Sequence, residues 1–488
     1  MKITYTSIAL AVAAVLAQPS GALAQASVKP NGFGLVSADG QSSVNLTGVV
    51  QFDARSIQDG LLESADKDAA SGADNFEVRR ARIGINGTLF KDIDYEILTN
   101  VVGSSPNLVH RAYVNYGFNK AAQVRVGRFK QPFSLEELTS ANAIDFMERS
   151  YGNQLVPSHR LGAGVFGEPT KGFTYAFSIY QDGFNDISNT DQVGNSNVGR
   201  IALNLADFAN ISGTVIHLGA AADQGRYQVL PTVSTDSGKV ADYVTRATIV
   251  SFRSEDRGLA NAYRFQLGGD WITPTYGGAA NNAANVKKDL KGLELVLATG
   301  PVKFQTESFN AAYNASAINY QLKGTGPSPV LTADNNAGTA NLNVSAKTNY
   351  YALVYNLTGE KWSDAYKAGA FGAIKPKSNF STASGGGWGA WQLAARVSTY
   401  EASVAATSAN ASGIADGAAG KSRAENAEKA TTITYGVNWI LNPNSRVLLN
   451  YARTNFGRPV TYLSTTTPSG LGTTSKEDVL SVRSQINF

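Results

Sequence analysis

Strict alternation of apolar and polar residues recurs along almost the whole of this 488-residue chain. Between Thr431 and Leu441, for example, Ile433, Tyr435 and Val437 alternate with threonine, glycine and asparagine. A period of two is that of a β-strand with one apolar and one polar face. The same pattern occurs in segments 44–52, 81–89, 93–101, 111–118, 173–180, 198–205, 261–271, 293–298, 350–357 and 391–400. Because each apolar face needs an apolar partner, lipid outside and water inside a closed barrel would suit both faces.

The connections between these segments are alternately short and long. Short turns fall at 90–92, 119–121, 168–171, 299–301 and 442–445, and long polar loops at 55–75, 219–242, 310–346, 401–430 and 455–476. Short turns at one rim and long loops at the other are typical of outer-membrane barrels. We therefore expect an all-β fold, a closed antiparallel transmembrane β-barrel of about 16 strands (16–18), over residues 43–488. Segment 358–387 is an exception, because it is long and yet falls on the short-turn side.

Both ends of the chain carry export signals. Lys2, the apolar stretch 8–17 and Ala22-Leu23-Ala24 predict a signal peptide over residues 1–24, with cleavage after Ala24 or, as second choice, after Ala26. Residues 25–42 would then be a periplasmic N-terminal segment. The alternating stretch Val479–Phe488 closes on a terminal aromatic, as the last strand of outer-membrane barrel proteins does. We expect the outer membrane of a Gram-negative bacterium, with its lipid as a partner.

Composition and motifs argue against several other classes. There is no cysteine, which excludes disulfides and thiolate metal sites. The net charge of +4 does not indicate a nucleic-acid partner. His110, His159 and His217 are far apart in the sequence, and Gly162–Gly167 matches G-x-G-x-x-G without a following helix. No G-x-S-x-G is present, so we expect neither an enzyme nor a metal or cofactor.

Residues 130–160 form a long insertion after a strand that ends at Lys130. Ser134 and Glu137 have the spacing of a capping box, which favours a helix start. The apolar residues of the insertion argue against disorder. Such an insertion could extend outward into solvent or inward into the lumen, and we predict an inward constriction loop.

The arginines of the strands fall on the polar face. An arginine that faced lipid at mid-bilayer would cost roughly 2–4 kcal/mol, so these side chains should point into water. They could be ordinary polar lining, or they could make a positive lumen that attracts anions. Acidic residues on the same faces, such as Asp53, Glu96 and Glu294, would weaken that field. The expected pore-lining residues on the strands are Arg80, Arg82, Arg111, Arg125, Arg200, Arg264 and Arg396, and the insertion adds Lys130, Glu137, Arg149 and Arg160.

Several longer stretches resemble the phosphate-selective porin O and P family. They include VRVGRFKQPFSLEELTS with FMERS, FEVRRARIGINGTLF, and GVNWILNPNSRVLLNYAR. The resemblance covers most of the mature chain. It implies a homotrimer of barrels of about 16 strands, each with its own pore and a long third loop folded inside. It also implies an arginine ladder that leads anions to a lysine-rich constriction.

Four positions matter within this resemblance. Arg79 and Arg80 match the paired arginines of the ladder, and Arg149 matches the arginine that ends the constriction loop. Alternation puts Arg79 and Arg80 on opposite faces, which a β-bulge or a position above the bilayer would reconcile. Glu137 stands where the phosphate channels carry a lysine. Its carboxylate would either repel phosphate at the constriction or cap the loop helix by pointing back to Ser134.

The predicted function is an outer-membrane porin whose water-filled channel passes small anions, phosphate and polyphosphate among them. The alternative is a weakly selective or general porin for small polar solutes, with a constriction dominated by acidic loop residues.

Overall fold

The computed structural model describes most of the predicted barrel. The described residues are 25–29, 32–58, 75–102, 108–182, 194–229, 232–233, 243–244, 247–257, 263–267, 280–323, 330–333, 340–383, 385–406, 428–463 and 471–488. The predicted signal peptide, residues 1–24, lies outside them, so its cleavage site stays a prediction.

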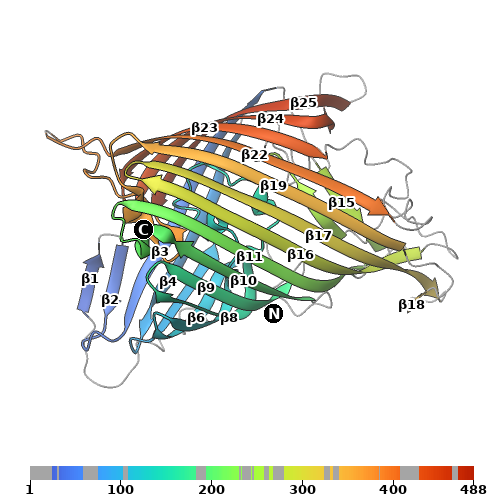
Figure 1. The fold of residues 1–488 in the computed structure, drawn as a ribbon, viewed down its shortest axis with the longest axis horizontal. Coiled ribbons are helices and arrows are strands. Elements are labelled where there is room, and N and C mark those ends of the chain that lie inside the picture. Colours follow the sequence, from blue (N-terminus) through green and yellow to red (C-terminus); the bar gives the residue numbers. More distant parts are fainter. Residues whose placement is uncertain are drawn as a thin grey trace.

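The described strands form one closed antiparallel barrel of 16 strands, in which each strand pairs with the next along the chain (Figure 1). Pairing of the last strand with the first closes the barrel, and the count agrees with the lower end of the predicted range. The strands are β3 (Ser43–Gln58), β4 (Asn75–Leu89), β5 (Ile93–Asn100), β6 (Val109–Asn119), β7 (Ala122–Lys130), β8 (His159–Thr170), β9 (Phe173–Asp182), β10 (Gly194–Asn204), β11 (Thr214–Val229), β16 (Ala280–Thr299), β17 (Val302–Lys323), β19 (Ala340–Asn356), β22 (Ala390–Ala406), β23 (Lys429–Asn442), β24 (Ser445–Leu463) and β25 (Leu471–Asn487).

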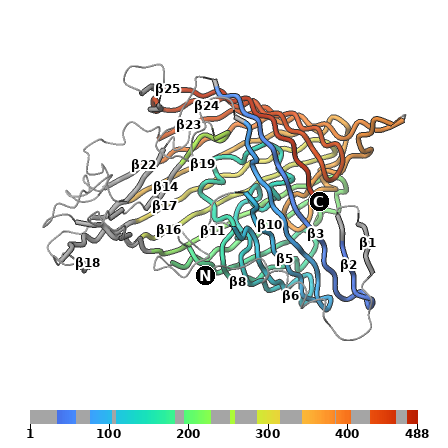
Figure 2. The backbone as a smooth tube through the Cα atoms, turned by 180° about the vertical axis from the view of Figure 1, so that it is seen from behind, coloured from blue at the N-terminus to red at the C-terminus, as the bar shows by residue number. Residues whose placement is uncertain are grey.

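The two rims differ as the connections predicted. Short turns join β4 to β5, β6 to β7, β8 to β9, β16 to β17 and β23 to β24 at the rim where the chain ends (Figure 2). The long connections lie at the opposite rim. In barrels of this kind the short turns face the periplasm and the long loops face outward. The Gly162–Gly167 motif falls within β8, so it consists of glycines in a barrel strand.

The two faces of the wall also follow the alternation. Outward side chains such as Ile83, Val114 and Leu353 are exposed and apolar. Inward side chains such as Gln51 and Thr434 are polar and buried, because they pack against segments that fill the lumen. The described part of the chain contains no helix long and apolar enough to cross a membrane.

Three sequence predictions about strands and loops were wrong. Residues 219–229 belong to β11, and much of 310–346 belongs to β17 and β19, although both segments were predicted to be loops. Strand pairing continues here beyond the apolar belt, where outward residues such as Arg226 and Asn310 need not be apolar. Of the predicted strand 261–271, the structure describes β15 (Tyr263–Leu267), which pairs with β14 (Ala247–Phe252) in a two-stranded sheet that is separate from the barrel wall. Alternation identifies a strand, but it does not identify the strand's partner.

The 130–160 insertion folds inward, as predicted. Its helical part is a single turn, α2 (Leu135–Leu138), followed by a 3-10 turn at Tyr151–Gln154. Leu135 and Met147 are completely buried. The helix is shorter than the apolar spacing suggested because donors from the barrel wall, and not the next helical turn, satisfy the carbonyl groups after residue 140.

The connection between β19 and β22 also enters the lumen. It contains α4 (Trp362–Ala365), β20 (Tyr366–Lys367) and β21 (Ala370–Phe371). Trp362, Phe371 and Ile374 are buried against Leu135 and Phe146 of the constriction loop. This packing explains why the one long connection on the short-turn side is rich in apolar residues.

The remaining elements lie at the rims. They are β1 (Gln25–Lys29) and β2 (Gly32–Val36), which form a hairpin beside the start of β3, α3 (Leu205–Phe208) between β10 and β11, β12 (Thr232–Val233) paired with β13 (Tyr243–Val244), and β18 (Val330–Ala333) paired with β17.

Candidate pore lining and constriction

Glu307 on β17 holds the start of the constriction loop. Its carboxylate accepts hydrogen bonds from the backbone N–H groups of Leu135 and Glu136, at 2.9 and 2.8 Å, and another from the hydroxyl of Tyr350. The first N–H groups of a helix have no partner within the helix, so a carboxylate there satisfies them directly. The sequence gives no local signal for this contact, because Glu307 lies far from residue 135 in the chain.

Three arginines of the strands hold the rest of the loop through its backbone. Arg446 donates to the carbonyl of Ile144 at 2.8 Å, Arg396 to that of Glu148 at 3.1 Å, and Arg483 to that of Met147. Buried carbonyl groups need donors, and a loop without regular structure cannot provide them itself. These arginines therefore position the loop.

All four acidic side chains of the loop are in ion pairs. The pairs are Glu136 with Arg396 at 3.2 Å, Glu137 with Arg149 at 3.5 Å and with Lys130 at 3.8 Å, Asp145 with Lys303 at 2.8 Å, and Glu148 with Arg79 at 2.9 Å, with Arg483 at 3.1 Å and with Arg55 at 3.2 Å. Burial alone would raise the pKa of Glu148, but Arg79 and Arg483 hold this pKa well below its usual value. The loop's negative charge is thus compensated inside the protein.

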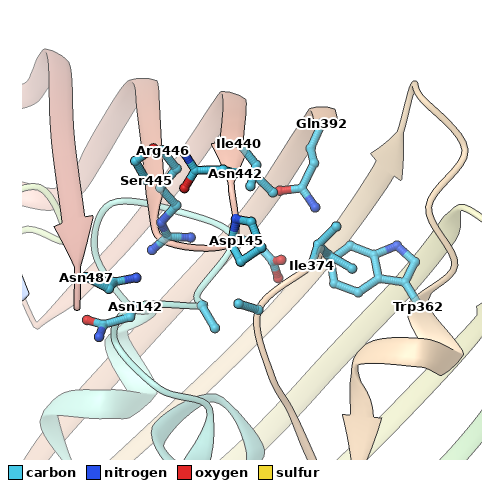
Figure 3. A pocket seen from close by; sticks show the side chains of 13 residues that line it. Asn142, Asp145, Trp362, Ile374, Gln392, Ile440, Asn442, Ser445, Arg446 and Asn487 are labelled. Carbon is cyan, nitrogen blue, oxygen red and sulfur yellow. The ribbon is translucent and has the colours of Figure 1, made fainter. Parts of the chain in front are cut away.

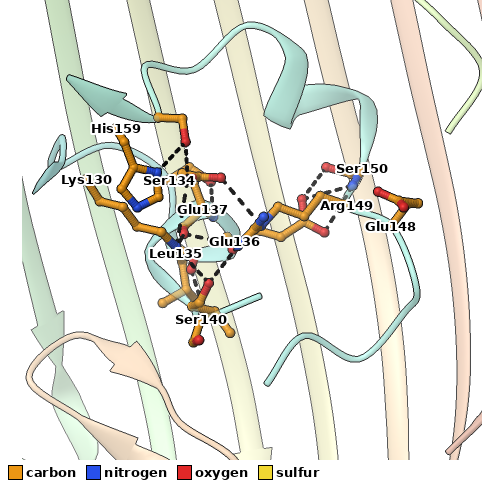
Figure 4. A network of polar contacts seen from close by, with 12 residues as sticks. Lys130, Ser134, Leu135, Glu136, Glu137, Ser140, Glu148, Arg149, Ser150 and His159 are labelled. Carbon is orange, nitrogen blue, oxygen red and sulfur yellow. Dashed lines mark hydrogen bonds and ion pairs between the residues drawn. The ribbon is translucent and has the colours of Figure 1, made fainter. Parts of the chain in front are cut away.

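Glu137 lies in a small polar network with Lys130, Ser134 and Arg149 (Figure 4). Its backbone N–H donates to the hydroxyl of Ser134, so Ser134 caps α2 as the sequence predicted. The carboxylate does not return to Ser134. It accepts a hydrogen bond from Ser158 at 2.8 Å and lies beside Lys130 and Arg149. Only 2% of Glu137 is exposed, so its carboxylate does not face the open channel.

A β-bulge turns both Arg79 and Arg80 inward. The register between β3 and β4 shifts between Gln51 and Phe52, where Gln51 faces Arg80 and Phe52 faces Val78. Arg79 contacts Glu148 of the loop, and Arg80 donates to the side chain of Gln51 at 2.6 Å. The bulge that the resemblance required is present.

The part of the wall from β4 to β7, named the β4–β7 wall, carries three arginines without acidic partners. Arg80 and Arg82 donate to the side-chain oxygens of Gln51 and Asn100. The guanidinium of Arg125 lies over the rings of Tyr113 and Phe166, at 4.3 and 4.6 Å from their centroids. None of these three arginines forms an ion pair with a described residue, and Arg111 on the same wall pairs with Glu96 at 2.8 Å.

The other predicted lining residues divide differently. Arg200 forms a two-point ion pair with Glu294, at 2.9 and 2.6 Å, so its charge is compensated. Arg396 holds the loop, and Arg160 lies on β8 opposite Phe129. The side chain of Arg264 lies outside the described residues. His110 and His159, far apart in sequence, have ring centroids 4.1 Å apart.

A further inward segment, residues 252–257, begins at the last residue of β14 and was not predicted. Glu255 accepts a hydrogen bond from the N–H of Tyr151 at 2.9 Å and pairs with Arg396 at 2.8 Å. Phe252 stacks on Tyr400 with ring centroids 4.2 Å apart. Burial raises the pKa of Glu255 to about 7 and that of Asp256 to about 6. The run of apolar residues before Glu255 was the available signal, but it resembles a strand.

The free space in the lumen is uneven. Where the β19–β22 connection packs under the loop, Trp362 and Ile374 lie close to Asp145 and leave a cavity of only about 20 Å³ (Figure 3). Beside β7, β8 and β9 a cavity of about 450 Å³ remains, and Arg125 and Lys130 contribute to its lining. Of the three arginines without an ion pair, Arg125 lines this cavity, whereas Arg80 and Arg82 do not.

Several known proteins are similar to this chain in sequence or in structure. Porin O of Pseudomonas aeruginosa is 27% identical over 392 residues, which is 78% of this chain and 77% of the relative. Among solved structures, the outer-membrane protein OmpT of Vibrio cholerae in its trimer form aligns with 92% of this chain and with 99% of its own length. The two are 10% identical, with a TM-score of 0.47. The outer-membrane channel DcaP of Acinetobacter baumannii covers 94% and 100% at 12% identity, also with a TM-score of 0.47. The sequence model of the family described as "Phosphate-selective porin O and P" matches residues 44–488. The chain therefore belongs to the phosphate-selective porin O and P family, and it is a channel-forming porin of the Gram-negative outer membrane.

Proposed function

We propose that this porin conducts small anions along the β4–β7 wall. One observation carries the proposal. Every acidic side chain of the constriction loop is in an ion pair, whereas Arg80, Arg82 and Arg125 have only uncharged partners. Cations whose charge is not compensated bias a narrow pore toward anions. Arginine keeps its charge at any physiological pH, so the bias should persist across conditions.

The same geometry supports weak binding of phosphate at the constriction. The carboxylate of Glu137 already lies beside Lys130 and Arg149 and accepts the hydrogen bond of Ser158. A phosphate ion that approached these groups would meet a carboxylate with which they already interact. We therefore propose that phosphate crosses as one small anion among others.

The zero-current potential of the purified porin in a planar bilayer, under a KCl gradient, tests the anion preference. The proposal expects a potential of the sign given by Cl⁻ permeation, and only shallow current block when phosphate is added. A near-zero or cation-selective potential would instead support a general porin governed by acidic loop residues. Deep block by phosphate would contradict weak binding at Glu137.

We also propose, from the family resemblance, that the barrel assembles as a homotrimer in outer-membrane lipid. Light scattering in detergent should then give three times the mass of the chain, and single insertions should close in three equal conductance steps. A monomer mass together with single-step closure would contradict the trimer.

A further inference from the structure

We propose that the cavity beside Arg125 selects small organic anions that carry an apolar ring, such as aromatic carboxylates, over inorganic anions. The inference rests on the anion path proposed above and names the solutes that this path favours.

The cavity has the size of a small-molecule site. Its volume of about 450 Å³ lies within the range of roughly 300–1,000 Å³ that is usual for ligand pockets. It lies between β7, β8 and β9 and the underside of the constriction loop. Lys120 and Lys367 line both this cavity and a hollow of about 640 Å³ at the short-turn rim, so the two spaces are adjacent.

Arg125 is the anion-binding group of the cavity. Its guanidinium is held by Tyr113, Phe166 and Phe129, with ring centroids 4.3, 4.6 and 5.6 Å away. Stacking on aromatic rings restricts the plane of a guanidinium and leaves the N–H groups at its edge to bind oxygen atoms. The Nε of Arg125 is buried against its neighbours, so a solute can reach only the outer N–H groups of the guanidinium, which form no hydrogen bond with a described residue. A carboxylate is a suitable two-oxygen partner for such an edge.

Three other inward cations are already bound by carboxylates or carbonyls, whereas Lys120 and Lys367 also line the cavity, at its end near the short-turn rim. Lys288 lies between the carboxylates of Asp182 and Asp223, and Arg200 is bound at two points by Glu294. The ammonium of Lys130 lines the cavity, but it already donates to the carbonyls of Glu137 and Thr139. Lys130 therefore adds positive charge, while Arg125 provides the unused donor.

The rest of the lining favours an apolar body over a hydrated ion. Phe129 and Phe166 lie against Arg125, and Pro132 and Leu138 line the same cavity, to which Glu168 also contributes. A phosphate ion would lose water against these side chains and gain few hydrogen bonds in return, which is unfavourable. An aromatic ring that entered the cavity would be removed from water, which is favourable for an apolar surface. One end of the cavity thus fits a carboxylate and the other a ring.

The test compares benzoate with acetate and inorganic phosphate as blockers of the KCl current through the purified porin in planar bilayers at pH 7. We expect half-block by benzoate at a concentration about tenfold lower than by acetate, as withdrawal of roughly 60 Å² of apolar surface from water would give. Phosphate should behave like acetate. Phe166→Leu and Leu138→Ser should each reduce the difference between the half-block concentrations of acetate and benzoate to about twofold or less. Leu138→Ser alters only the constriction loop, so it still tests the inference if Phe166→Leu does not fold. Phe118→Leu, on the outer face, is the matched control and should keep the full ratio.

Equal half-block concentrations for benzoate and acetate would overturn this inference, as would a ratio that survives both lining variants. Neither result changes the sign of the zero-current potential, so the anion channel proposed above would stand. A cation-selective potential would instead defeat the proposed function itself.

Discussion

Arg483 on the last strand and Asp53 on the first strand form a two-point ion pair across the seam of the barrel, with both N–O distances at 2.7 Å. The two residues face each other in the β25–β3 register. The same guanidinium donates to the carbonyl of Met147 and lies 3.1 Å from the carboxylate of Glu148. One buried arginine therefore both closes the barrel and holds the constriction loop.

Replacement of Arg483 by alanine should destabilise the barrel. The change leaves the buried carboxylate of Asp53 with Arg55 as its remaining cation, and the loss of one partner of a buried pair costs roughly 3–5 kcal/mol. The midpoint of unfolding, followed by the heat-dependent mobility of the barrel on gels, should fall clearly. Lys429→Ala on β23 is the control, since its ion pair with Glu401 is solvent-exposed and should matter little. Equal midpoints for the two variants would show that the seam pair adds no net stability.

Glu137→Lys should strengthen anion selectivity and produce or deepen block by phosphate. The change removes a carboxylate and adds an ammonium beside Lys130 and Arg149, so an anion becomes the natural partner of all three groups. The zero-current potential and the phosphate titration measure the two effects. Glu137→Gln separates loss of the negative charge from gain of a positive one and should lie between the two. If neither property changes, Glu137 has no part in the constriction.

Combined replacement of Arg80 and Arg125 by alanine should reduce the anion preference. Both arginines have only uncharged partners, so their removal lowers the positive potential of the β4–β7 wall directly. The zero-current potential should move toward zero, most clearly at low salt, where screening is weak. Lys291→Ala on the outer face of β16 is the matched control. An unchanged potential in the double variant would mean that these arginines are ordinary polar lining.

Acidification should close the channel partly through Glu255. Burial against the loop raises the pKa of Glu255 to about 7 from an ordinary value of 4.5, even with Arg396 beside it. The docked segment 252–257 thus binds this proton more tightly than a released segment would, so a fall in pH through 7 favours docking. Between these two pKa values the stability that the proton adds to the docked segment grows as the pH falls, and this added stability is absent above pH 7.

Single-channel conductance, measured from pH 8 to pH 5, should therefore decrease as the pH falls. Glu255→Gln should keep the low conductance at every pH, because its side chain is permanently neutral. A pH response in that variant as large as in the unaltered porin would assign the effect to another group.

Much of the fold followed from local pattern. Alternation identified the barrel and its faces, and the connections identified the two rims. The pattern overestimated the loops at 219–242 and 310–346, because strand pairing above the bilayer does not require outward apolar residues. It also placed Tyr263–Leu267 in the wall, because a hairpin packed elsewhere has the same period.

The sequence by itself determined that the arginines within the apolar belt of the strands face inward, because an arginine in lipid is too costly. Only the tertiary structure decided what each one does. Arg396, Arg446 and Arg483 reach loop carbonyls that are more than two hundred residues away in the chain, whereas Arg80 and Arg125 have no such partner. The same holds for Glu137, whose capping role was local but whose neighbours Arg149 and Ser158 come from the returning half of the loop. Alternation fixes the direction of a side chain from its own strand, but contacts across the lumen depend on how the loop and both inward connections fill it.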